Sequence, residues 1–167
     1  LLEELRRSNE ILYHLESLQI PVVAAITGVC LGGGLELALS CHIRVCSDKA
    51  LLSFPETGIG IIPGLNGTVR LPGKLGLCRS LEMVLAGNVI HADEALALGL
   101  VDYVVPSKEV LEFSLKLLET MTGGRSVNII HSIMKSANNS RKLSFDAATE
   151  EETELFARLV LSRLHME

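Results

Sequence analysis

The 167-residue sequence contains no tryptophan, and aromatic residues make up only 4% of it. Hydrophobic residues nevertheless reach 48%, so aliphatic side chains are expected to form the core, and an intrinsically disordered chain is excluded. The 15 basic residues are outnumbered by 20 acidic ones, which gives a net charge of -5. Since no overall positive charge exists to attract a polyanion, a nucleic-acid partner is not expected. A chain of this length is expected to form one domain.

The sequence also lacks the motifs of metal and disulfide sites. Its four cysteines have no paired Cys-x-x-Cys spacing and stand among apolar residues, so each is expected to be a buried, reduced thiol: Cys30, Cys41, Cys46 and Cys78. The histidines show no metal-ligand or triad pattern either, so no metal is expected. Reduced thiols fit the cytoplasm or the mitochondrial matrix. The chain has no initiator methionine, and its acidic first residues argue against a signal or transit peptide, so a truncated or processed chain is expected.

A membrane span is weighed for the stretch from Ile20 to Cys41, because Glu36 is its only charged residue. Pro21 and several glycines interrupt this stretch. A buried segment of a protein without a membrane span is therefore the favoured interpretation.

The hydrophobic pattern predicts an α/β chain whose strands come early and whose helices come late. Strands are predicted at residues 21–26, 43–46, 51–53 and 103–105, and helices at residues 1–18, 35–41, 78–86, 92–98, 108–121, 127–137 and 145–163. The first strand is continuously apolar, which is typical of a strand covered on both faces in a parallel sheet. The loop of residues 55–67 is too apolar for a solvated connection, so it is expected to line a site.

Three consecutive glycines, Gly32 to Gly34, lie between a predicted strand and a predicted helix. A tight turn there can point free backbone amides at a negatively charged oxygen. It can equally serve only to let the strand and helix pack closely, and the local sequence favours this structural interpretation. The segment does not have the P-loop pattern.

Two glutamates stand isolated in apolar surroundings. Glu36 is flanked by Leu35 and Leu37, and it either interacts with the dipole of its helix or serves as a general acid/base whose proton affinity is raised by burial. Glu56 follows Pro55 in the apolar loop, and a capping role for it is strained by distance along the chain. The two residues form a plausible acid/base pair. Arg70 is interpreted as bracing a loop in preference to approaching a phosphate.

Four segments together closely resemble the enoyl-CoA hydratase/isomerase, or crotonase, superfamily. They are residues 21–28, residues 31–38 with Gly-Gly-Gly-Leu-Glu, residues 54–56 with Phe-Pro-Glu, and residues 60–64, and the similarity continues through residues 70–72 and 95–102. The resemblance implies the α/β, crotonase-like spiral β-β-α fold with its N-terminal part missing. Residues 1–106 would form the partial spiral core, and residues 107–167 a helical C-terminal and oligomerisation region of a homotrimer or hexamer.

The resemblance also implies roles for single residues. Glu36 and Glu56, twenty positions apart, match the two catalytic glutamates of hydratases, and Gly33 matches one of the two amides that hold the thioester oxygen. The expected substrate-binding residues are Leu31, Gly32, Pro55, Ile59 and Gly64. Two departures are noted: His42 stands where many members carry Asp and is interpreted as a core or interface variation, and Asn66 occupies a usually small position near the site.

The function implied by the resemblance is hydration of a 2-enoyl-CoA thioester, or the reverse dehydration. No separate cofactor is expected, because coenzyme A is part of the acyl-CoA substrate. One alternative is an enoyl-CoA isomerase, which would need Glu56 far more than Glu36. Another is an inactive truncated chain or assembly module, because the family's second oxyanion amide has no counterpart before Leu1.

Overall fold

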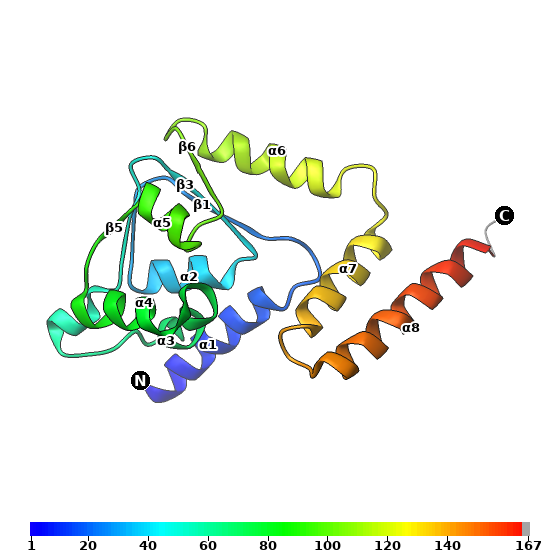
Figure 1. Cartoon of the computed structure of the whole chain (residues 1–167), viewed down its shortest axis with the longest axis horizontal. Helices are drawn as coiled ribbons and strands as arrows, with labels where there is room; N and C mark the ends of the chain where they lie inside the picture. The colour runs from blue at the N-terminus through cyan, green and yellow to red at the C-terminus, as the bar shows by residue number, and fades with distance from the viewer. Residues whose placement is uncertain (165–167) are drawn as a thin grey trace.

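The structure, a computed structural model, describes residues 1–164. Figure 1 shows a core of short strands and helices, with the α7–α8 hairpin lying to one side of it. The strands are β1 (Val23–Ile26), β2 (Val29–Leu31), β3 (Ile43–Ser47), β4 (Leu51–Ser53), β5 (Ile90–His91) and β6 (Tyr103–Val105). The helices are α1 (Leu2–Glu16), α2 (Gly33–Ser40), the 3-10 helix η1 (Pro55–Ile59), α3 (Gly67–Arg70), α4 (Pro72–Ala86), α5 (Ala92–Leu98), α6 (Val110–Thr122), α7 (Val127–Asn139) and α8 (Phe145–Leu164).

The strands form two small sheets that the chain visits in turn. One sheet has the order β1-β3-β6 and is parallel throughout, and the other has the order β2-β4-β5, with β4 and β5 antiparallel. The chain passes from β1 to β2 and from β3 to β4 through a few residues, so each passage adds one strand to each sheet. Helix α2 follows the first pair of strands, which gives the strand-strand-helix repeat of a spiral.

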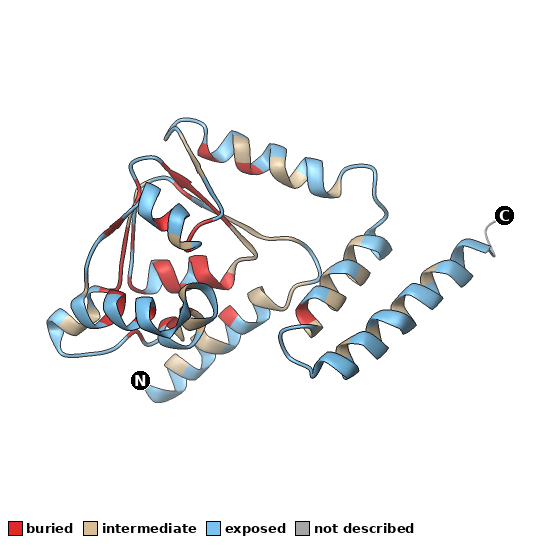
Figure 2. Ribbon diagram, in the orientation of Figure 1, coloured by how far each residue is buried: buried red, intermediate tan, exposed pale blue. Residues whose placement is uncertain are grey.

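The hydrophobic core lies on the two sheets and α2, where Figure 2 shows the buried residues concentrated. Its fully buried members include Leu35 of α2, Val45 of β3 and Leu52 of β4. Aliphatic side chains dominate this core, as the composition predicts, and Phe54 is its one fully buried aromatic residue in the described part of the chain. Burial of this apolar surface is the main force that fixes the chain segments around α2.

One buried cation fastens β3 to the segment between α5 and β6. The Arg44 side chain is 1% exposed and donates to the backbone carbonyls of Leu100 and Cys41, both at 2.9 Å. Its Nη2 also lies 2.6 Å from the Asp102 carboxylate. All three donor groups of the guanidinium are thus engaged, as a buried charge requires.

The helices after β6 cover less of the core. Helix α6 packs against β1 and β3, whereas α7 packs mainly against α8, which buries no residue over its described length. The boundary between residues 106 and 107 stays a prediction, and residues 165–167 of the second region lie outside the described range. None of the helices within residues 1–164 is both long and apolar enough to cross a bilayer.

Several predicted boundaries differ from the structure. Helix α2 begins at Gly33 and not at residue 35, so two of the three glycines lie in its first turn. Helix α4 begins at Pro72, well before residue 78, and is interrupted at Gly76, whose positive φ of 74° breaks the helical pattern. Strands β2 and β5 and the 3-10 helix η1 were not predicted, because each is too short to show a periodicity.

The first strand is not covered on both faces, which contradicts the prediction. In β1, Ala25 is exposed and only Ile26 is buried. Both β1 and β2 are edge strands in the described part of the chain, and residues 23–30 line an open groove of about 430 Å³ with Leu37 and Cys41 of the α2 segment. The apolar run identifies the strand correctly, but it does not determine what lies against it.

The cysteines are free thiols, but not all of them are buried. Burial raises the pKa of Cys30 and of Cys46 to about 11, so both thiols stay protonated near neutral pH. Cys41 is partly buried, and Cys78 is exposed on α4. The prediction of burial is therefore wrong for Cys78, whose apolar neighbours Leu77 and Leu81 are themselves exposed.

Candidate active site

The buried carboxylate of Glu36 is the centre of the candidate site. Glu36 lies on α2 and is 2% exposed. Its Oε1 accepts hydrogen bonds from the backbone N–H groups of Leu65 and Gly67, both at 2.7 Å. The second donor is the first residue of α3, so a helix N-terminus points at the carboxylate. The loop between η1 and α3 therefore fixes one oxygen of Glu36 and leaves the other for different contacts.

The backbone around these donors is built for close approach. Asn66 precedes Gly67 in the left-handed conformation, with a φ of 69°, which Asn adopts more readily than most residues. A Cβ at Gly67 would lie 3.0 Å from Glu36 Oε1 and 2.8 Å from the buried ring of Phe54. Only glycine therefore fits at residue 67 without displacing its neighbours.

The pKa of Glu36 is raised above its ordinary value, mainly because burial penalises the charged form. The hydrogen bonds from Gly67 and Leu65 and the charge of Arg70 act in the opposite direction. The negative charge of Glu56 raises the pKa further, so the structure brings the two predicted glutamates within electrostatic reach of each other. A carboxyl with this balance holds a proton more readily than an exposed glutamate does.

Glu56 lies in η1 and is half-buried. Its Oε2 is buried and has no hydrogen-bond partner within residues 1–164, while its Oε1 would lie 2.8 Å from a Cβ at Gly32. Thr57 donates to the carbonyl of Val84 at 3.2 Å, which ties η1 to α4. Burial of a carboxylate oxygen without a hydrogen-bond partner costs free energy. Such an oxygen is therefore often found where a ligand or water binds.

The triple glycine stands beside these carboxylates. The N–H of Gly32 donates to the carbonyl of Ser53 at 3.0 Å, which joins the start of α2 to the end of β4. Gly33 is exposed and is the first residue of α2. Because the N–H groups of the first turn have no acceptor within their own helix, the N–H of Gly33 can bind another group. A helix N-terminus carries partial positive charge, and a negatively charged oxygen would be stabilised there.

The remaining predicted substrate-binding residues lie at the surface around the carboxylates. Leu31, at the end of β2, is 38% exposed, and Ile59, at the end of η1, is 77% exposed. Pro55 is also exposed, and the carbonyl of Gly64 accepts from Asn9 Nδ2 of α1 at 3.2 Å. Their roles in substrate binding stay predictions.

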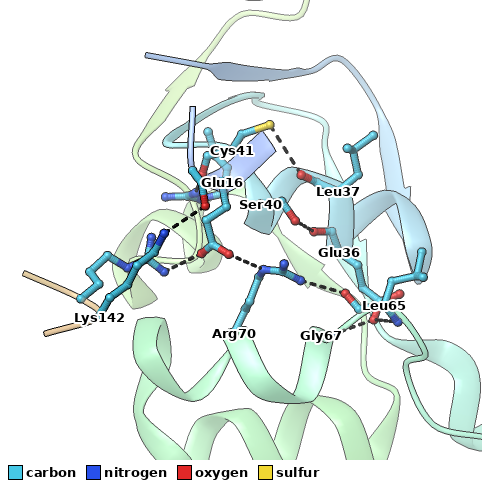
Figure 3. A network of polar contacts seen from close by, with 12 residues as sticks. Glu16, Glu36, Leu37, Ser40, Cys41, Leu65, Gly67, Arg70 and Lys142 are labelled. Carbon is cyan, nitrogen blue, oxygen red and sulfur yellow. Dashed lines mark hydrogen bonds and ion pairs between the residues drawn. The ribbon is translucent and has the colours of Figure 1, made fainter. Parts of the chain in front are cut away.

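Arg70 braces the loop that holds Glu36, in agreement with the favoured interpretation. Its Nη1 donates to the carbonyl of Leu65 at 2.8 Å, and its Nε donates to Glu16 of α1 at 3.2 Å. Figure 3 shows Arg70 between Glu16 on one side and Leu65 on the other, with Glu36 next to Leu65. This side chain is engaged within the protein and does not extend toward solvent.

His42 is partly buried and pairs with the backbone of Val22, not with the two carboxylates. Its Nδ1 accepts from the N–H of Val22 at 3.1 Å, and its own N–H donates to the carbonyl of the same residue at 3.0 Å. Burial lowers the pKa of His42, which keeps the ring neutral near neutral pH. The interpretation of His42 as a core or interface variation stays a prediction.

Two groups that define the site were not identified from the sequence. The N–H groups of Leu65 and Gly67 lie 29 and 31 positions from Glu36, and backbone donors carry no side-chain signal. The Asn-Gly pair at the start of α3 is the one local hint, because it favours a tight turn into a helix whose N-terminus can bind an anion.

Known proteins with similar sequences belong to one family. The family model described as enoyl-CoA hydratase/isomerase matches residues 5–164. The chain is 41% identical over 153 residues to the fatty acid oxidation complex subunit alpha of Shewanella loihica, which covers 87% of this chain and 21% of that protein.

Solved structures show the same relationship. The enoyl-CoA hydratase of Bacillus anthracis superposes with a TM-score of 0.87 at 31% identity, over 93% of this chain and 60% of that one. The enoyl-CoA hydratase of Thermoplasma volcanium gives a TM-score of 0.84 at 30% identity, over 94% and 62%. The chain therefore has the crotonase-like α/β fold and spans about three fifths of the length of these structures and about one fifth of the Shewanella protein.

Proposed function

Since the chain belongs to the enoyl-CoA hydratase/isomerase family, we propose that it adds water across the 2,3-double bond of an enoyl-CoA thioester, or catalyses the reverse dehydration. The observation that carries the proposal is the placement of two carboxylates at the N-terminus of α2: Glu36 lies in the first turn of that helix, and Glu56 Oε1 would lie 2.8 Å from a Cβ at Gly32, the residue that precedes the helix. A pair of carboxylates can hold one water molecule between them. An acid/base pair of this kind suits hydration better than a lone base does.

In the proposed hydration, the two glutamates and the N–H of Gly33 have separate roles. The water oxygen attacks the β-carbon while one carboxylate accepts a water proton, and the electrons of the double bond move onto the thioester oxygen. The N–H of Gly33 stabilises that developing negative charge, because a fixed donor needs no reorganisation during the reaction. The other carboxyl then delivers a proton to the α-carbon. Burial raises the pKa of Glu36, so this carboxyl holds a proton more readily than an exposed glutamate, which suits a proton donor.

The substrate is proposed to be an acyl-CoA thioester, with coenzyme A as its carrier and no further cofactor in the reaction. Leu31, Pro55 and Ile59 would line the acyl chain, and Gly64 would lie near the reacting water. Gly32 would contribute by its lack of a side chain, since a Cβ there would lie 2.8 Å from Glu56 Oε1.

The test replaces each glutamate by its neutral isostere. Glu36→Gln and Glu56→Gln should each lower kcat for hydration of a short 2-enoyl-CoA by on the order of 10²- to 10⁴-fold, the range of general acid–base catalysis. Glu82→Gln, at an exposed residue paired with Arg79, is the matched control and should keep full activity. Circular dichroism and thermal unfolding check that the variants fold. Near-normal turnover in either test variant would remove that residue from the mechanism.

Isomerisation of the double bond is the second candidate, favoured by Oε2 of Glu56, which has no hydrogen-bond partner among residues 1–164 and could act as a single base. The same variants separate the two reactions. An isomerase would lose activity with Glu56→Gln and largely keep it with Glu36→Gln, and mass spectrometry of the product would show no gain of water.

A third possibility is that the 167-residue chain is itself an inactive or assembling unit. Gly33 supplies one oxyanion amide, and the chain spans 60% of the Bacillus hydratase structure. Activity is therefore measured on the 167-residue chain and on any longer product of the same gene. Hydration by the longer product alone would assign the 167-residue chain a structural role.

We further propose that the helical region after residue 106 contributes to a homotrimer or a dimer of trimers. Exposed apolar side chains on its helices support this, among them Leu111 of α6, Ile133 of α7 and Phe156 of α8. Light scattering coupled to size-exclusion chromatography tests the proposal, and a monomer would contradict it.

A further inference from the structure

We propose that Arg70, Glu16 and Arg141 form a positioning network through which the turn between α7 and α8 sets the geometry of the Glu36 carboxylate. The network joins the end of α1 with Glu16, the last residue of α3 with Arg70, the loop before α3 with Leu65, and the start of the α7–α8 turn with Arg141. As an account of catalysis, this inference rests on the proposed role of Glu36. As an account of structure, it stands on contacts that need no substrate.

The inner link of the network is the backbone of Leu65. Its N–H donates to Glu36 Oε1 at 2.7 Å, and its C=O accepts from Arg70 Nη1 at 2.8 Å. Displacement of the Arg70 guanidinium therefore moves the same residue that orients the carboxylate. Figure 3 shows Leu65 beside both Arg70 and Glu36.

The outer link is the carboxylate of Glu16, which binds a different arginine with each oxygen. Oε2 lies 3.2 Å from Arg70 Nε, and Oε1 lies 2.6 Å from Arg141 Nη2. The Glu16 and Arg70 side chains are 15% and 7% exposed, whereas Arg141 is 55% exposed. The inner pair is thus largely shielded from water, where loss of one partner is costly, and the outer pair is accessible to substitution.

Further contacts hold the turn in place against α1. Lys142 Nζ donates to Ser17 Oγ at 3.0 Å and lies 4.7 Å from the ring centre of Tyr13. Asn138 Nδ2 donates to the carbonyl of Leu18 at 3.4 Å. A cavity of about 330 Å³ lies between the turn and the start of α4, so the turn is held there by its polar contacts with the end of α1 and not by close apolar packing on α4.

The charges around Glu36 are few, which makes its titration a direct report on the network. Glu56 on η1 and Arg70 on α3 are the charged side chains that act on it, and the N–H groups of Leu65 and Gly67 lower its pKa. If the loop loosens, these hydrogen bonds weaken and the pKa of Glu36 rises. A role of Arg70 as a charge alone would not depend on the geometry of its hydrogen bonds.

The experiment compares Arg70→Lys, Arg141→Gln and the control Arg158→Gln. Lysine keeps the positive charge but cannot direct two separate N–H groups at Leu65 and Glu16 as the guanidinium does. Arg141→Gln cuts only the exposed outer link and is expected to fold normally. Arg158 pairs with Glu154 on the exposed face of α8 and is expected to be neutral.

The first readout is the pKa of Glu36 in the 167-residue chain, followed by NMR of ¹³C-labelled glutamate carboxyls, with the signal assigned by its loss in Glu36→Gln. The pKa should rise in Arg70→Lys, rise less in Arg141→Gln and stay unchanged in Arg158→Gln. Wild-type titration of Glu36 in both test variants would overturn the proposal and leave the network a structural staple.

The second readout is hydration kinetics in the protein product that is active. Arg70→Lys should lower kcat by on the order of tenfold or more while KM stays within about twofold, because a misplaced acid affects the chemical step more than binding. A change in KM alone would contradict a positioning role. If Glu36→Gln keeps full hydration activity, the proposed function fails, but the titration still decides whether the network exists.

Discussion

Replacement of Gly67 by alanine tests how closely the site around Glu36 is packed. A Cβ at this position would lie 2.8 Å and 2.9 Å from Cε1 and Cζ of Phe54, and 3.0 Å from Glu36 Oε1. Phe54 is fully buried, so its ring has no open space to move into. Gly67 lies in α3 and does not have a positive φ, so alanine is compatible with the backbone and the effect is steric.

The magnitude follows from the contacts. An added methyl group in a well-packed core costs about 1–3 kcal/mol of unfolding free energy. For a chain of this size each kcal/mol lowers Tm by roughly 2–4 °C, so Gly67→Ala should lower Tm by about 2–12 °C. Gly67 also donates to Glu36 at 2.7 Å, so the substitution should impair the acid/base function as well.

Gly73→Ala is the matched control, because a Cβ at Gly73 in α4 would meet no atom within 4 Å. Alanine in a helix is favoured over glycine by up to about 1 kcal/mol, so this variant should not lower Tm. The assay is thermal unfolding followed by circular dichroism. Equal Tm values for the two alanine variants would refute the steric argument.

A double variant locates the steric conflict. Phe54→Leu removes the ring atoms nearest to the added methyl, so Gly67→Ala should cost less in its presence. The combined loss should be smaller than the sum of the single losses by on the order of 1 kcal/mol. Additive losses would show that the ring is not what the methyl group meets.

Two further predictions concern stability. Arg44→Met should lower the unfolding free energy measured in urea by about 3 kcal/mol, because it leaves buried partners unpaired, whereas Arg158→Met should change it by less than about 0.5 kcal/mol. Burial lowers the pKa of His42, so the folded state binds fewer protons than the unfolded state, and the unfolding free energy should fall as pH drops through about 6.5 toward the folded pKa. His42→Asn should remove this part of the pH dependence, and an unchanged slope would contradict it.

The candidate glutamates could be predicted because their signal is local. Glu36 and Glu56 each stand alone among apolar residues, and an isolated acid in such surroundings must be compensated or functional. The long helices α1, α6, α7 and α8 were predicted close to their observed bounds. Short elements such as β5, with two residues, give no period to detect.

The contacts that orient Glu36 could not be predicted in the same way. Its donors are backbone N–H groups, and the outer link of the network joins Glu16 to Arg141 across 125 positions. Charged residues such as Arg141 are common on the surface of any helical turn. Which of them meets a given carboxylate depends on how the α7–α8 hairpin lies against α1.

The sequence by itself was enough to predict the family, the α/β fold and the two glutamates as candidate site residues, because motif spacing and apolar runs are properties of neighbouring residues. Only the tertiary structure decided that β1 is an edge strand in the described chain, that Cys78 is exposed, and that Leu65 and Gly67 hold Glu36. These features depend on which segments distant in sequence come into contact, because those contacts determine the burial, the pKa and the hydrogen-bond partners of each side chain.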